Sequence, residues 1–413
     1  MGIPTTIGRF AVKEQASSWG TPETSFANAN YLEAQIAVLT PAQASVQAEV
    51  MRASWFATTR LDGGKGPTEL SLTTPLHGFS TAAPTDHPTE HPDALLLRSV
   101  LGANVLGGYA TDVAGGSATT LDVTTGVASI CGSALMPPMA TSGDYSIGWV
   151  KAKASDEYTM QRKWALTAAG AEQQPNSSGT LYGSNSIFLT NTQPTPFTLE
   201  WLGSTANMKF RFSDCVVTSA TINLNAREQP QLAVTIRSAN WTNVGSGGSP
   251  SAEALTNRPQ MPVVLSDNGA RVVNAAAEQK AGSATLTMTA DVADEINYDA
   301  PQGIAKFVVT KRTVEVQMVA PAASTGESSL DNPASLLAPG TAAGALQLDA
   351  GTTPGRAFSA LIPSGVVKEV QALGDSNSLV SITTMLECGI YAGDTTDGST
   401  PAVMNTPFRV AFL

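Results

Sequence analysis

The chain has 413 residues, of which 23 are basic and 34 acidic, so its net charge is −11. Only 14% of the residues are charged, against about a quarter in an average soluble protein. This composition excludes a wholly disordered chain, since 42% of the residues are hydrophobic. It also excludes a protein that grips nucleic acid through a basic surface. We expect no membrane partner, because no stretch approaches the roughly 18 uninterrupted apolar residues of a span.

The first fifty residues carry little regular pattern. They begin MGIPTTIGRFAVKEQ, without the basic region and apolar core of a signal peptide. We therefore expect residues 1–50 to form an N-terminal arm. Cys131, Cys215 and Cys388 are odd in number and widely spaced, which favours buried thiols made in a reducing compartment over a disulfide framework.

Residues 51–245 read as a β-rich domain with one helix near residues 93–102. The helix is predicted in PDALLLRSVLGA, where Asp93 can cap the N-terminus and an apolar stripe ends at Gly102. Further along, apolar and polar residues alternate in 218–226 and again in 231–237. A period of two over such lengths predicts strands that are buried on one face only.

The second half of the chain repeats this strand style. Residues 246–282, which open with a Gly/Ser-rich run, are predicted to be a linker or loop. Residues 283–413 then supply further strands, either completing the first fold or forming a second β domain. Residues 321–355 are rich in Ala, Gly, Pro and Ser and predict a long loop within this part.

The sequence offers little material for catalysis. Asp86, His87, His91 and Asp93 could suggest a metal site, but two prolines prevent the helix that would align the imidazoles, and a solvated turn is favoured. His77 is the only other histidine, too few for a Ser–His–Asp or Cys–His site. We expect no enzyme, no metal site and no cofactor.

The order of features resembles the tail tube proteins, or major tail proteins, of long-tailed bacteriophages. The resemblance covers an irregular N-terminal arm, a strand leading into a helix, a strand pair with a polar turn, and closing strands. Its segments are GPTELSLTTPLHG, PDALLLRSVLGA, FRFSDCVVTSATINLNAREQPQLAVTIRSANW, VVKEVQALGDSNSLVSITTMLECGIYAG and TPFRVAFL. The family's single tube domain is commonly shorter, which leaves open whether this chain holds one decorated domain or two fused ones.

The resemblance implies an all-β sandwich or barrel of two packed sheets with one flanking helix. Copies would close into rings, hexameric, or trimeric if the domain is duplicated, and the rings would stack into the conduit for DNA ejection. Implied partners are other copies of the chain, the tape measure and terminator proteins, and passing double-stranded DNA that is not tightly bound. The implied location is the virion tail, after synthesis in the cytoplasm of a bacterial host.

The low content of charged residues also favours an assembly subunit, because strands that face other copies or a channel can be polar without being charged. The candidate channel-facing residues are the polar sides of three strands: Thr221, Asn223, Asn225, Thr285, Thr287, Thr289, Glu315 and Gln317. An open alternative is a surface or adhesin-type β-sandwich that binds a ligand. Another tail component, such as a terminator, distal tail or baseplate protein, is a further alternative.

Overall fold

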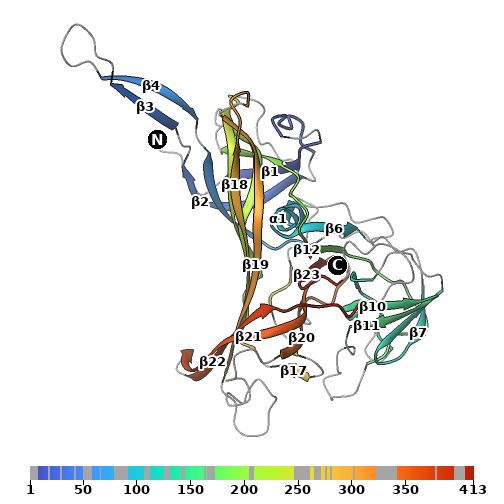
Figure 1. The fold of residues 1–413 in the computed structure, drawn as a ribbon. Coiled ribbons are helices and arrows are strands. Elements are labelled where there is room, and N and C mark those ends of the chain that lie inside the picture. Colours follow the sequence, from blue (N-terminus) through green and yellow to red (C-terminus); the bar gives the residue numbers. More distant parts are fainter. Residues whose placement is uncertain are drawn as a thin grey trace.

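The computed structural model describes most of the chain. The described residues are 8–16, 19–27, 30–40, 43–49, 58–65, 67–78, 92–106, 112–124, 131–140, 145–161, 164, 173–203, 209–245, 261–264, 271–274, 277–279, 281–300, 303–321, 342–376, 379–394 and 405–413. Within them the chain forms 23 strands and one helix (Figure 1). The predicted all-β fold of two sheets with one helix is confirmed.

Eight antiparallel strands form a long, curled sheet in the order β2-β5-β15-β14-β18-β19-β22-β21. From the first half of the chain come β2 (Tyr31–Thr40), β5 (Thr68–Pro75), β14 (Lys209–Asn225) and β15 (Gln231–Asn243). From the second half come β18 (Ser283–Ile296), β19 (Ile304–Pro321), β21 (Phe358–Ser376) and β22 (Leu379–Cys388). Strands β18 and β19 run the length of the molecule (Figure 1).

One end of this sheet curls into a closed ring of strands. Strands β1 (Gly8–Glu14) and β13 (Phe197–Gly203) pair with each other, while β1 also pairs with β2 and β13 with β14. The six strands β13-β1-β2-β5-β15-β14 therefore close on themselves. Along one edge, the first part of β14 pairs with β13 and its later part pairs with β18. Strand β14 therefore joins the two halves of the chain.

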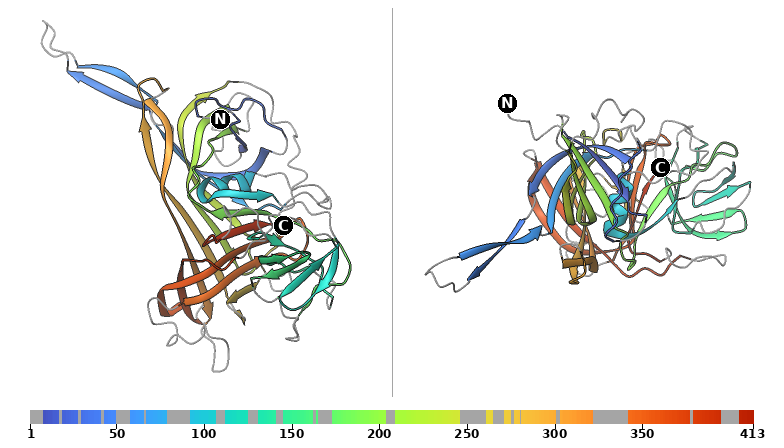
Figure 2. Two further views of the ribbon diagram at one scale, coloured as in Figure 1. Left: turned by 45° about the vertical axis from the view of Figure 1, so that its right-hand side comes forward. Right: turned by 90° about the horizontal axis from the view of Figure 1, so that it is seen from above.

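The other end of the sheet is extended by short strands. These are β20 (Ala342–Ala350), β16 (Arg271–Asn274) and β17 (Ala277–Gln279) on one path, and β23 (Arg409–Phe412), β12 (Asn185–Leu189) and β6 (Gly102–Leu106) on the other. A separate hairpin, β3 (Gln43–Glu49) with β4 (Thr58–Lys65), projects away from the body in both Figure 1 and Figure 2.

A second sheet lies beside the long one, in the order β7-β8-β11-β10-β9. Its strands are β7 (Val113–Gly116), β8 (Thr120–Val123), β9 (Ala134–Leu135), β10 (Gly148–Ala154) and β11 (Glu157–Met160). It has an apolar cluster of its own, and a second cluster joins it to β21 and β23. At that joint the Trp149 indole N–H donates to Ser359 Oγ at 2.9 Å, so the ring is buried without an unsatisfied donor.

Helix α1 (Pro92–Leu101) covers the core face of the long sheet where β14 meets β18. Every helical residue except Arg98 is buried. Gly102 ends the helix at φ +123°, where a Cβ would lie 2.5 Å from Thr190 Oγ1, so a larger residue would be both strained and obstructed. The helix predicted near residues 93–102 is confirmed, displaced by one residue.

Three of the expected irregular segments contain strands. Residues 1–50, expected to be an arm, hold β1 and β2, which are part of the closed ring. Residues 246–282, expected to be a linker, include β16 and β17, and β20 occupies part of the loop expected at 321–355. These strands are stabilised by partners far away in sequence, which local patterns do not reveal.

Candidate functional site

The eight candidate residues lie on one face of three neighbouring strands, β14, β18 and β19. Strand register places Thr221 opposite Thr287, which is opposite Glu315. The next row aligns Asn223, Thr285 and Gln317, and Thr285 Oγ1 lies 3.3 Å from Asn223 Oδ1. The structure thus assembles separate patterns into one surface, which we call the polar face.

The opposite side of the same strands is the main hydrophobic core. Ile222, Leu286 and Val316 form one cross-strand row and each is fully buried. Because side chains alternate along a strand, this burial fixes which residues belong to the polar face. The alternation predicted from sequence for these strands is therefore confirmed.

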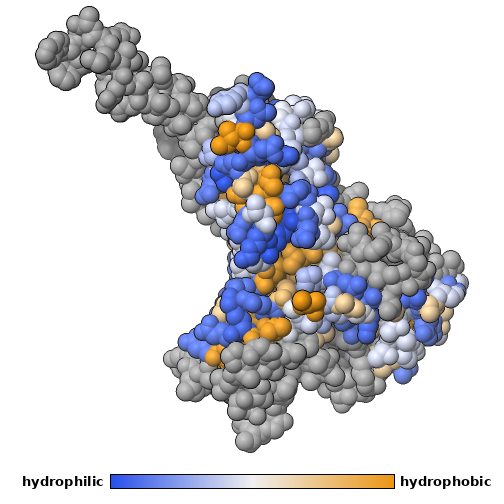
Figure 3. Space-filling model, viewed as in Figure 1, coloured by the Kyte–Doolittle hydropathy of each residue, from blue (hydrophilic) through white to orange (hydrophobic). Residues whose placement is uncertain are grey.

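The polar face continues beyond the three predicted strands. Thr221 also aligns with Ala233 of β15 and, through it, with Thr73 of β5. On the other side, Gln317 aligns with Met385 of β22. Most of the coloured surface in Figure 3 is hydrophilic, with scattered apolar patches.

Two basic groups on the polar face, Lys368 and Arg237, are paired with carboxylates. Lys368 Nζ contacts Glu315 Oε1 and lies 2.9 Å from Glu387 Oε1. Hydrogen bonds to Glu315 and Glu387 raise the pKa of Lys368. Across the sheet, Arg237 Nη2 lies 2.8 Å from Asp294 Oδ2, and its guanidinium stacks 5.2 Å from the centre of the Phe307 ring. The positive charges of Lys368 and Arg237 are therefore largely balanced by neighbouring carboxylates.

Lys368 was missed by the sequence analysis because a bulge changes its direction. The pairing of β21 with β22 shifts register between Val367 and Glu369, which leaves Lys368 as the extra residue. The consecutive charges in the segment VVKEV were the available signal, since two neighbouring charged residues break a period of two.

The long sheet ends in two open edges. Strand β1 pairs with β2 only as far as Ala34, and among the described residues no strand covers that edge of β2 from Gln35 to Thr40. Similarly, β20 pairs with β21 only as far as Val366, and no described strand covers that edge from Val367 to Ser376. An open edge exposes rows of unpaired backbone groups and favours pairing with another chain.

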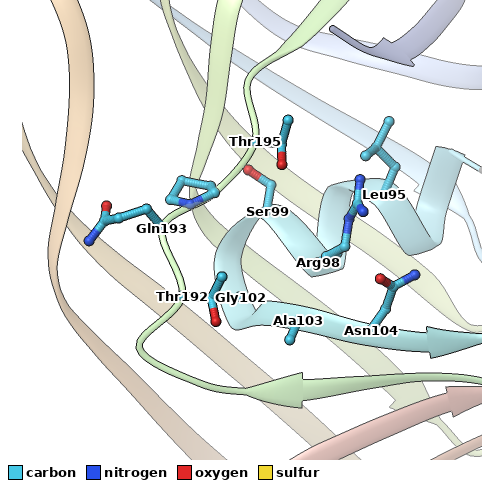
Figure 4. Close-up of a pocket in the computed structure, with 10 residues that line it drawn as sticks. Leu95, Arg98, Ser99, Gly102, Ala103, Asn104, Thr192, Gln193 and Thr195 are labelled. Atoms are coloured by element: carbon cyan, nitrogen blue, oxygen red, sulfur yellow. The ribbon is translucent and has the colours of Figure 1, made fainter. Parts of the chain in front are cut away.

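A pocket of about 210 Å³ lies at the C-terminal end of α1, between β6 and residues 192–195. Figure 4 shows its polar side chains, which come from Arg98, Ser99, Asn104 and the segment after β12. Arg98 Nη2 lies 2.7 Å from Glu14 Oε2, and Ser99 Oγ accepts the Val217 N–H at 3.0 Å. These contacts hold the helix against the sheet, so we assign the pocket a structural role.

The buried charges outside the polar face also serve the fold. Arg409, in the last strand, is fully buried and ion-pairs with Asp394, while its guanidinium lies 5.4 Å from the centre of the Tyr391 ring. Glu200 is likewise fully buried between Lys209, at 2.7 Å, and Arg211. Buried charges need such partners because desolvation is costly.

The proposed turn around the histidines is only partly visible. Asp86, His87 and His91 lie outside the described residues. Asp93 is buried, and its Oδ2 accepts the backbone N–H of His77 at 2.9 Å and lies 3.2 Å from His77 Nδ1. No group of three potential metal ligands occurs in the part of the chain that the structure describes.

The comparisons give no relative from which to transfer a function. No family model matches the chain, and no curated protein matches it. Within the described ranges, no helix has both the length and the apolar character needed to cross a membrane.

Proposed function

We propose that the chain is a structural subunit of a bacteriophage tail tube. Copies join edge to edge into rings, the rings stack, and the enclosed channel conducts DNA into the host during ejection. The observation that carries this proposal is the polar face of the long sheet of eight antiparallel strands, whose outer strands β2 and β21 each have an edge that no described strand covers. Ring closure would pair both edges, which otherwise favour aggregation.

The chemistry of the polar face suits a wall past which DNA slides. Its central rows on β14, β18 and β19 are Thr, Asn and Gln with Glu315, and two of its cations, Lys368 and Arg237, are neutralised by neighbouring carboxylates. A Lys/Arg stripe would instead bind phosphates by releasing their counterions. The net charge of −11 acts in the same direction.

The remaining roles follow from this assignment. The partners are other copies of the chain, then the tape measure and terminator proteins, with duplex DNA passing through without tight binding. The subunit is made in the bacterial cytoplasm and works in the virion tail. We propose no catalytic activity; the buried ion pairs of Glu200 with Lys209 and Arg211, and of Arg409 with Asp394, serve the fold.

Electron microscopy of the purified full-length protein tests the function. We expect stacked rings or tubules with a central channel wide enough for duplex DNA. Dispersed monomers that bind glycans would contradict the tube and favour the adhesin-type alternative.

A further inference from the structure

The two halves of the long sheet repeat one strand topology. The first half of the chain supplies four strands of the long sheet, in the chain order β2, β5, β14 and β15. Across the sheet these strands occupy the first, second, fourth and third positions, respectively. In the second half the chain forms β18, β19, β21 and β22, which again lie as first, second, fourth and third. The two four-strand units follow one another along the sheet, and β14 of the first pairs with β18 of the second.

The units also correspond residue by residue. Strands β5 and β19 both end in proline, with Pro75 opposite Gln231 and Pro321 opposite Ser381. Superposing the two prolines aligns TELSLTTP of β5 with VEVQMVAP of β19. The alignment matches Glu69 with Glu315 and keeps every core position apolar or threonine.

An independent irregularity confirms this register. The β14–β15 ladder shifts at Thr218, directly after the Val217–Ile236 pair. The β21–β22 ladder shifts at Lys368, directly after the Val367–Leu386 pair. The proline alignment, which uses neither bulge, makes Ile236 equivalent to Leu386 and so superposes the two bulges. A coincidence of bulge and register indicates a duplicated unit with conserved geometry.

We propose that β21 of one copy pairs with β2 of the next copy in the register of the internal β14–β18 junction. The repeat makes β21 equivalent to β14 and β2 equivalent to β18, and β21 and β2 are the outer strands of the eight, each with an edge that no described strand covers. Eight strands of alternating direction leave β2 and β21 running oppositely. The new pairing is therefore antiparallel, like every other pair in the long sheet.

The internal junction specifies which residues meet. Thr221 lies opposite Thr287, and the repeat makes Gln371 equivalent to Thr221 and Thr40 equivalent to Thr287. Gln371 of one copy therefore lies opposite Thr40 of the next. Gln371 is exposed in the single chain, as a residue at an unfilled junction should be.

The repeat also sets the number of copies, on the assumption that the proposed DNA channel is correct. At about 4.8 Å per strand and a strand tilt of about 40°, three copies give 24 strands and a barrel roughly 48 Å across at the backbone. Inward-pointing side chains leave roughly 36 Å, enough for a B-form duplex of roughly 20 Å. Two copies give 16 strands and leave roughly 20 Å, which allows no clearance around the duplex. The duplicated chain thus favours a trimeric ring over the hexamer.

Disulfide cross-linking of the full-length protein tests the pairing. We expect Thr40→Cys with Gln371→Cys to give covalent dimers and closed trimers under mild oxidation, because the two residues face each other across copies. The matched control is Thr221→Cys with Thr287→Cys, the equivalent internal pair, which should cross-link within one chain. A second control, Thr40→Cys with Glu369→Cys, moves the pair by two positions and should cross-link at least tenfold more slowly.

Two of the three native cysteines, Cys215 and Cys388, do not compete in this experiment. Burial raises the pKa of Cys215, and burial with the adjacent Glu387 raises the pKa of Cys388 to about 12. Since the thiolate is the reactive form, both stay unreactive near pH 8. Single-cysteine variants at residues 40 and 371 show the remaining background.

The outcomes separate this inference from the proposed function. Tubules without the Thr40–Gln371 cross-link, or equal cross-linking of the displaced pair, would overturn the pairing and leave the tube intact. Closed cross-linked trimers that never stack into a channel would support the pairing and overturn the tube. Native mass spectrometry of six copies in one ring would overturn the three-copy closure.

Discussion

At the scale of single residues, alternation along β18 separates two environments one position apart. Leu286 is fully buried in the main core, whereas Thr287 lies half-buried on the polar face opposite Glu315. We expect Leu286→Lys to lower the free energy of unfolding by more than about 3 kcal/mol, because the substitution buries an unpaired charge. Thr287→Lys should stay within about 1 kcal/mol of wild type. Equilibrium urea denaturation measures both, and equal stabilities would show that the faces are assigned wrongly.

Asp214 gives a second residue-scale prediction, on pH dependence. Burial raises its pKa, although hydrogen bonds from Gly20 N–H, at 2.6 Å, and Gln15 Nε2 oppose the shift. The folded protein therefore keeps this proton to higher pH than the unfolded chain does. The free energy of unfolding falls as the pH rises from the unfolded pKa through the folded one, and the loss persists at neutral pH.

Asp214→Asn should remove that loss. Asn keeps a carbonyl acceptor for Gly20 and tolerates the backbone φ of +54°. We expect the variant to gain stability over wild type at pH 7 and to lose this advantage near pH 3, below both pKa values. Thermal unfolding at the two pH values measures the difference, and Asp299→Asn, at an exposed position, is the control. An advantage that is the same at both pH values would contradict the burial argument.

At the scale of elements, the sequence could predict those strands whose own alternation is strong. The segments around Ile222, Leu286 and Val316 were predicted correctly as strands, with the correct side buried. A strand that is buried on one face alternates apolar and polar residues, and this pattern is visible in the sequence. Strands β16, β17 and β20 are short or lie in small-residue segments, and pairing across the sheet determines them. The common polar face also could not be predicted, since register between strands is a tertiary property.

Helix α1 supplies the element-scale prediction. The Arg312 guanidinium, on β19, donates to the carbonyl oxygens of Val100 at 2.7 Å, Thr190 at 2.8 Å and Thr192 at 2.8 Å. One of these is an end carbonyl of the helix, which otherwise lacks a helical partner. The contact ties the helix to the second four-strand unit.

Arg312→Met should therefore lower the free energy of unfolding by about 1–3 kcal/mol, because three accepting carbonyls lose a charged donor. Arg312→Lys should recover only part of this, since an ammonium cannot reproduce the planar fork. Lys311→Met, at the exposed neighbouring position, is the matched control and should stay near wild type. Chemical denaturation provides the measurement, and an Arg312→Met protein as stable as the control would remove the anchoring role.

At the scale of the whole molecule, the two units explain features that seemed unrelated in sequence. The long sheet contains a second set of four strands, joined to the first by the β14–β18 junction, and under the proposed function this set accounts for a size that exceeds a single tube domain. The same junction accounts for the uniform chemistry of the polar face, because both units contribute rows to one surface. In the proposed ring, closure would extend that surface around a channel without any new type of contact.

The charge of that surface gives the last prediction. The proposed wild-type tubes should retain no duplex DNA at moderate salt, because Lys368 and Arg237 on the polar face are already neutralised and the chain carries a net charge of −11. Thr285→Lys with Thr287→Lys adds two charges per copy on neighbouring rows and should bind DNA with an affinity that falls steeply as salt increases. Ser177→Lys with Ser178→Lys, at exposed positions between the second sheet and β12, adds the same charge elsewhere. Filter retention of labelled duplex DNA by assembled tubes measures all three, and equal retention by the two lysine variants would exclude the polar face as the channel wall.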